Sequence, residues 1–156
     1  MLAPKPELAY GLAMKTIQHE VLINAPVARV YDAIATADGI STWWDPQTPK
    51  QTDRGLVLEH NPGPEHGIVQ LLVDDRVPNT RIEWECVSTH PASSPASAWT
   101  GTHFIFDLSE RGGATNLRFR QTGYDERSAF FTSNADAWQN VLANLKRTVE
   151  LRPARA

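Results

Sequence analysis

The last long segment of the chain, residues 133–151, constrains the fold most. One face of this segment carries Trp138, Val141, Leu142, Leu145, Thr148 and Val149 at helical spacing, and polar residues occupy the other face. The pattern predicts an amphipathic helix that Ser133 caps, with Asp136 three residues later as a capping-box-like partner, and that Pro153 ends. Because almost everything before it reads as strand, we expect a sheet curled around this helix.

Length, composition and charge limit the classes of protein to which the chain can belong. The 156 residues are most simply one domain, over residues 15–152, after a flexible N-terminal arm at 1–14. A net charge of −3 argues against nucleic-acid binding. No apolar run approaches the roughly 20 residues needed to span a membrane. The single cysteine, Cys86, fits a reducing cytoplasm, where we expect the protein to act.

Alternating apolar and polar residues predict a first strand at 15–24. Pro26 then begins a short helix that runs to Thr36, and 40–44 forms a second helical turn. Further strands are predicted at 56–60, 67–73, 81–88, 100–108 and 114–122, with 46–54, 74–79 and 123–132 as loops or turns. Short connections make the sheet antiparallel, so the predicted class is α+β with the order β-α-α-β-β-β-β-β-α.

Several short sequences, in this order along the chain, resemble one superfamily. They are Ile23-Asn24-Ala25-Pro26, Ile40-Ser41-Thr42-Trp43-Trp44, Arg81-Ile82-Glu83-Trp84, Thr100-Gly101-Thr102, Thr115-Asn116-Leu117, and Trp138 with Leu142 and Leu145. The set resembles the START-like, Bet v 1-like (SRPBCC) helix-grip superfamily, and within it the AHSA1-like group, named for an activator of the Hsp90 ATPase. The resemblance implies a sheet wrapped around the C-terminal helix, with a cavity for an apolar molecule between them.

The inward-facing residues of the expected elements are the candidate cavity lining. They are Trp43, Trp44, Trp84, Thr102, Phe104, Phe106, Phe119, Gln121, Tyr124, Phe130, Trp138 and Leu142. Apolar walls with a few polar groups are typical of small-molecule sites. The adjacent indoles of Trp43 and Trp44 cannot face the same way, so we expect one in the core and the other near the mouth. The alternative is that the whole set packs a solid core.

Motifs of catalysis and metal binding are missing from the sequence. The five histidines occur without an HExxH or CxxC pattern, so we expect no metal and no cofactor. Glu83, Glu85 and Arg81 share a solvated strand face, and Cys86 points inward as a packing thiol. No catalytic residue can be assigned.

Three functions remain open. The first is binding of a small, mostly apolar ligand of the lipid, sterol, polyketide or aromatic type. The second is catalysis by a cyclase, dehydratase or hydrolase in the same cavity. The third is a co-chaperone role toward an Hsp90-type partner, which the resemblance alone implies. The strand edges also allow a homodimer.

Overall fold

The computed structural model describes residues 14–125 and 127–151 of the chain. Met14 begins the first strand, so it does not belong to the expected N-terminal arm; the rest of the arm, 1–13, lies outside the described residues. Pro153, the expected helix stop, lies outside them too. Within the described ranges, no helix has both the length and the apolarity needed to cross a bilayer.

Strands and helices follow one another in an α+β order. They are β1 (Met14–Ile23), α2 (Val27–Ala35), α3 (Ala37–Ile40), β2 (Thr48–Thr52), β3 (Gly55–His60), β4 (Val69–Val77), β5 (Arg81–Cys86), the 3₁₀ helix η1 (Pro95–Ala98), β6 (His103–Arg111), β7 (Ala114–Asp125) and α4 (Phe131–Leu151).

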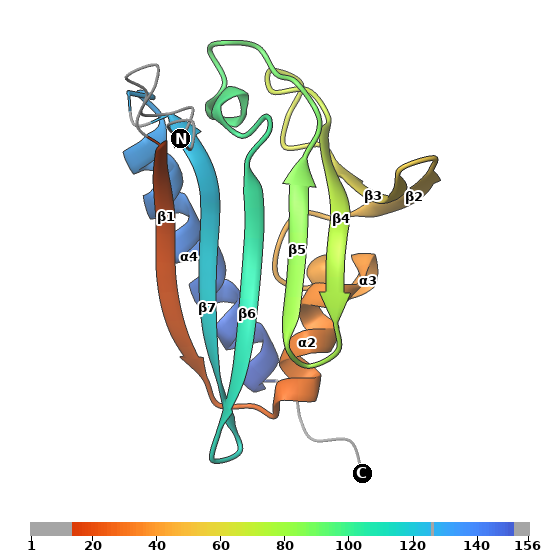
Figure 1. The fold of residues 1–156 in the computed structure, drawn as a ribbon, viewed down its shortest axis with the longest axis vertical. Helices are drawn as coiled ribbons and strands as arrows, with labels where there is room; N and C mark the ends of the chain where they lie inside the picture. Colours follow the sequence, from red (N-terminus) through yellow and green to blue (C-terminus); the bar gives the residue numbers. More distant parts are fainter. Residues whose placement is uncertain (1–13, 126, 152–156) are drawn as a thin grey trace, which may run out of the picture.

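One curved sheet organises the molecule. The strands described pair antiparallel in the order β1-β7-β6-β5-β4-β3-β2. The described α-helices lie on one face: α4 runs behind β1, β7 and β6, and α2 and α3 lie behind β5 and β4 (Figure 1). The predicted fold class, a helix-grip α+β domain with a long C-terminal helix, is confirmed.

The prediction that residues 46–54 form a loop was wrong. Thr48–Thr52 forms β2, which pairs with β3 from Thr48 opposite Glu59 to Thr52 opposite Gly55. All five side chains of β2 are exposed, so the strand has no apolar alternation from which it could be recognised. Backbone pairing and an ion pair between Lys50 and Glu59 at 3.4 Å hold it at the sheet edge, where Pro49 is tolerated.

Three strands extend beyond their predicted ends. One of them is β6, which runs to Arg111 rather than to residue 108. Asp74 and Asp75, predicted in a turn, continue β4, with an irregularity in pairing between Val73 and Asp75. Tyr124, predicted in a loop, lies in β7 and is fully buried. Gly123, at a φ of 94°, shifts the alternation so that the side chain of Tyr124 turns inward.

The long helix begins two residues earlier than predicted. Phe131 is its first residue, so Ser133 lies inside the first turn and its hydroxyl donates to the Phe130 carbonyl. The expected capping pair of Ser133 and Asp136 is therefore not formed. The buried face of the helix contains Asn134, Trp138, Leu142, Leu145 and Val149, as the spacing indicated.

Candidate ligand-binding site

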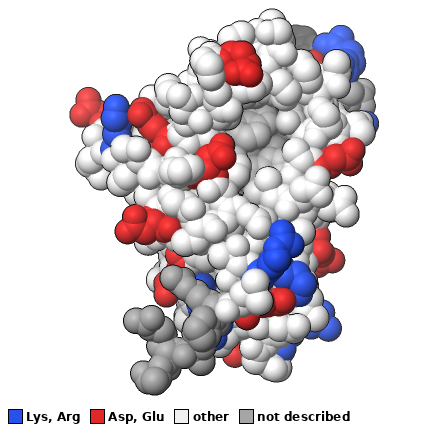
Figure 2. All heavy atoms as spheres, turned by 180° about the vertical axis from the view of Figure 1, so that it is seen from behind, with Lys and Arg blue, Asp and Glu red and all other residues white. Residues whose placement is uncertain are grey.

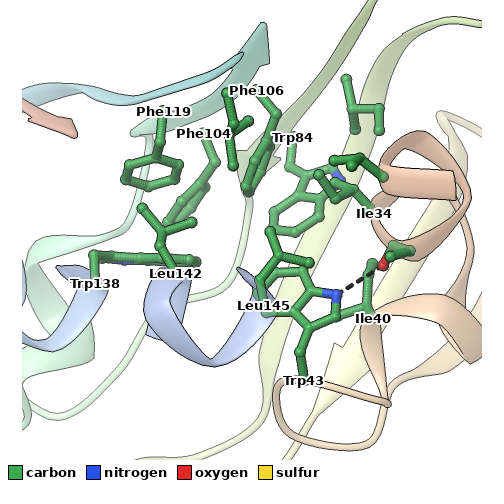
Figure 3. Packing of buried hydrophobic residues seen from close by; sticks show 14 of the residues in the cluster. Ile34, Ile40, Trp43, Trp84, Phe104, Phe106, Phe119, Trp138, Leu142 and Leu145 are labelled. Carbon is green, nitrogen blue, oxygen red and sulfur yellow. Dashed lines mark hydrogen bonds between the residues drawn. The ribbon is translucent and has the colours of Figure 1, made fainter. Parts of the chain in front are cut away.

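Aromatic residues fill the centre of the space between sheet and helix. Trp84, Phe104, Phe106 and Phe119 point from the sheet toward Trp138, Leu142 and Leu145 of α4 (Figure 3). Trp138 stacks on Phe119 with ring centroids 4.5 Å apart, and Trp84 meets Phe106 at 4.8 Å. These predicted lining residues therefore form a packed core, and the space for a ligand lies at one end of it.

A pocket of about 270 Å³ opens where the start of α4 meets η1 and the β3–β4 connection. Figure 2, which views the molecule from the side opposite Figure 1, shows a hollow in its upper part with acidic side chains around it. The pocket walls are formed by Trp44, Asp45, His60, Pro62, His66, Val69, Pro95, Ala96, Trp99, Ser133, Asn134 and Ala137. Among the described residues, no lysine or arginine lines the pocket.

The adjacent tryptophans Trp43 and Trp44 have different environments. Trp43 is buried in the core, where its indole Nε1 donates to the Ala33 carbonyl at 2.7 Å (Figure 3). Trp44 is half-buried and lines the pocket. Asn144 of α4 donates to the Trp43 carbonyl at 2.7 Å, which ties this turn to the helix and fixes Trp44 at the pocket wall.

A buried polar cluster lies between β7, the start of α4 and η1. Gln121 donates to the Thr102 hydroxyl at 2.9 Å, and Asn134 donates to the Tyr124 hydroxyl at 2.6 Å. Burial raises the pKa of Tyr124, while the side chains of Asn134, Trp99 and Gln121 around its oxygen oppose that rise. Thr102, Gln121 and Tyr124 were predicted to line the cavity; in the structure they lie behind the pocket wall that Asn134 forms.

Phe130 does not reach the pocket. It lies in a separate surface hollow with residues such as Ser97 and Arg127. The turn before α4 carries Phe130 away from the core, whereas Phe131 packs on Tyr124 at a centroid distance of 5.3 Å.

Several pocket residues were missed by the sequence reasoning. Trp99 follows η1, at a position to which the sequence analysis assigned no element, and it packs on Phe104 with ring centroids 5.2 Å apart. Ser94 caps η1 by accepting from the Ala96 amide, and its hydroxyl lies 2.7 Å from His66 Nδ1. His60 and His66 line the pocket with Trp44, and the sequence analysis included neither histidine in the candidate lining.

His60 is the most buried titratable group of the pocket. Its imidazole packs on Trp44 with ring centroids 4.5 Å apart, and its side chain is 1% exposed. Burial, together with a smaller contribution from nearby His90, lowers the pKa of His60 from 6.5 to about 4. The imidazole is therefore neutral near pH 7.

Two other groups with possible chemistry lie outside the pocket. Cys86 is fully buried, and burial raises the pKa of its thiol, so it is an unreactive packing residue. On the outer sheet face, ligand atoms of Asp74, Glu83 and His103 lie within 4.8 Å of one another. There His103 Nδ1 is 2.9 Å from Glu83, which Arg81 also contacts, so the cluster is a set of solvated ion pairs.

The fold, with its curved sheet gripping one long helix and a pocket at the end of the core, defines a helix-grip protein. The family described as Activator of Hsp90 ATPase homolog 1-like protein, AHSA1, matches residues 24–150. The chain belongs to the AHSA1 family. No curated protein sequence matches it.

Solved structures share the fold. The Aha1 dimer from Colwellia psychrerythraea has a TM-score of 0.74 at 24% identity, over 88% of this chain and 97% of that one. Protein MLL2253 from Mesorhizobium loti has a TM-score of 0.71 at 18% identity, over 90% of this chain and 100% of that one. DynU16, from the dynemicin biosynthetic locus, has a TM-score of 0.67 at 18% identity, over 90% of this chain and 49% of that one.

Proposed function

We propose that this protein binds a small, mostly apolar molecule of the aromatic or polyketide type in the pocket between Trp44 and Trp99. The observation that carries the proposal is the pocket itself. Two indoles, two prolines and small apolar side chains form most of its wall, and the polar groups come from Asp45, His60, His66, Ser133 and Asn134. Flat aromatic walls favour stacking with a flat ligand. Concave sites of this composition are the usual place for small molecules.

The volume of the pocket limits the size of the ligand that it can hold. A cavity of about 150 Å³ holds a benzene ring, and the pocket here measures about 270 Å³. It therefore suits a molecule of one or two rings better than a whole sterol or a lipid chain. The structural similarity to DynU16, from a biosynthetic locus, agrees with a ligand of this kind.

Calorimetric titration with naphthalene-type compounds, a fatty acid and a sterol tests the proposal. We expect saturable binding of the two-ring compounds and weaker or no binding of the larger two. Trp99→Ala should weaken binding at least tenfold, because it removes an aromatic wall. Phe130→Ala, which removes an aromatic ring outside the pocket, is the matched control and should leave affinity unchanged. The absence of binding by every compound would overturn the proposal.

A second candidate is a co-chaperone role, which the family match favours. The Aha1 of Colwellia psychrerythraea is a dimer, and the outer edges of β1 and β2, which no other described strand covers, would allow this chain to pair with a second copy. Adding the protein to an Hsp90 ATPase assay should raise the rate if this role is real, and an unchanged rate would remove it. Sedimentation analysis of the chain alone tests the dimer separately.

A further inference from the structure

Two hydrogen-bond acceptors face each other in the pocket. The side-chain amide nitrogen of Gln47 donates to the Asp45 backbone carbonyl at 2.7 Å. That bond fixes the orientation of the amide, so its oxygen, Oε1, faces His60 Nδ1 at 3.2 Å. An amide oxygen only accepts, and Nδ1 of His60 therefore carries the proton and donates it.

The other ring nitrogen of His60 is then an unprotonated acceptor. The neutral imidazole carries one proton, which lies on Nδ1, so Nε2 presents a lone pair. Asp45 Oδ2 lies 4.0 Å from Nε2, and a carboxylate oxygen is an acceptor as well. No described residue donates a hydrogen bond to Nε2, although the ring is almost completely buried. An acceptor that receives no hydrogen bond from the protein is available to a donor on a ligand.

We propose that the pocket selects aromatic molecules that carry a hydrogen-bond donor, a phenolic hydroxyl or a ring N–H, and that the donor lies between His60 Nε2 and Asp45 Oδ2. This inference rests on the proposed binding function and names the polar group of the ligand. The ring of Trp44, which packs against His60, holds the aromatic part of the ligand beside the donor site.

The negative charge of the pocket disfavours ligands that carry a carboxylate. Asp45 is the only charged side chain among the described lining residues, and no cation there compensates it. A carboxylate on the ligand would meet two acceptors and a negative charge. Fatty acids and aromatic acids are therefore disfavoured, and a neutral donor is favoured.

Calorimetry with matched pairs of probes tests the donor site on the full chain. The first pair is 2-naphthol and 2-methoxynaphthalene, and the second is indole and 1-methylindole; each pair differs in the donor. We expect each donor compound to bind about tenfold more tightly than its methylated partner, the usual effect of a hydrogen bond to a buried or charged acceptor. We expect 2-naphthoate to bind more weakly than either naphthalene compound.

Variants assign the effect to the two acceptors. His60→Phe keeps a ring against Trp44 and removes Nε2, so the ratio of affinities within a pair should fall to about one. His66→Phe, which changes the other pocket histidine, should leave the ratio near ten whatever it does to overall affinity. If His60→Phe does not fold, Asp45→Asn tests the same site, because Asp45 is the second acceptor and is half-exposed. This variant should lower the ratio of affinities within a probe pair severalfold.

The outcomes separate this inference from the binding function. Equal affinity for both members of each pair, with saturable binding, would overturn the donor site and leave the binding function standing. A ratio that His60→Phe and Asp45→Asn both leave unchanged would also overturn it. The absence of binding by every probe would overturn both.

Discussion

Trp138 of α4 stacks on Phe119 of β7 with ring centroids 4.5 Å apart and planes inclined by 27°. Both side chains are buried, and Trp138 also contacts Phe104 and Trp44. This contact joins the long helix to the sheet at the point where a central cavity was expected. It therefore separates the solid core from the pocket at its end.

Trp138→Ala should lower the free energy of unfolding by about 3–5 kcal/mol, because it removes a large buried aromatic and leaves a cavity. Trp138→Phe should cost less, since the indole Nε1 has no hydrogen-bond partner among the described residues. Urea unfolding followed by circular dichroism measures both. Gln139→Ala, at the exposed neighbouring position, should change stability by less than about 0.5 kcal/mol. A Trp138→Ala cost under about 1 kcal/mol would contradict this packing.

The low pKa of His60 predicts a pH-dependent contribution to stability. Folding keeps His60 neutral down to about pH 4, whereas the unfolded residue takes up a proton near pH 6.5. The unfolded state therefore binds more protons in this window, and stability falls as pH falls from 6.5 toward 4. At about pH 5 the loss amounts to about 2 kcal/mol relative to pH 7.5.

His60→Phe removes this titration, so the variant should lose less stability than the wild type between pH 7.5 and pH 5. The groups facing His60 are Asp45, Gln47, Trp44 and His90, and they stay in both proteins. Unfolding free energies at the two pH values give the comparison. Parallel pH profiles would show that His60 is not held neutral.

The Tyr124 hydroxyl should contribute to stability through Asn134. Tyr124→Phe leaves the Asn134 amide with only its 3.2 Å bond to the Pro95 carbonyl, and a buried polar group that loses a partner costs about 1–3 kcal/mol. Tyr31→Phe, where the hydroxyl makes no hydrogen bond with a described residue, should be nearly neutral. Thermal unfolding of the two variants distinguishes them, and equal melting temperatures would count against the buried cluster.

Gly39 allows α3 to pack on α2. A Cβ at position 39 would lie 2.3 Å from the Asp32 carbonyl oxygen and 2.9 Å from Ala33 Cα, both backbone atoms. Gly39→Ala should therefore destabilise the protein by about 1–3 kcal/mol, through forced separation of the two helices. Asp38→Ala, at the exposed preceding position, is the control. An unchanged unfolding midpoint for Gly39→Ala would show that the helices can move apart freely.

Local patterns predicted the elements that contribute one face to the core. In β5 the alternation of Ile82, Trp84 and Cys86 matches their burial, and the spacing of Trp138, Leu142 and Leu145 matches the buried face of α4. Strand β2 was missed because all its side chains are exposed, and its pairing depends on β3. Periodicity carries no information about a strand of this kind.

The pocket was only partly predictable. One tryptophan of the pair 43–44 was expected near a cavity mouth, and Trp44 lines the pocket. Its other walls come from the β3–β4 connection and from η1, which are distant in sequence from each other and from α4. The tautomer of His60 depends on the Gln47 amide, whose orientation a backbone carbonyl decides. Such relationships exist only in three dimensions.

The most direct test of the binding function is a proton–nitrogen correlation spectrum of the five tryptophan indoles during a titration with 2-naphthol. We expect saturable shifts of the Trp44 and Trp99 signals, because these indoles line the pocket. The Trp43 signal, whose N–H is bonded to the Ala33 carbonyl in the core, should stay in place. Unmoved Trp44 and Trp99 signals at saturating ligand, or shifts confined to other indoles, would contradict the proposed site.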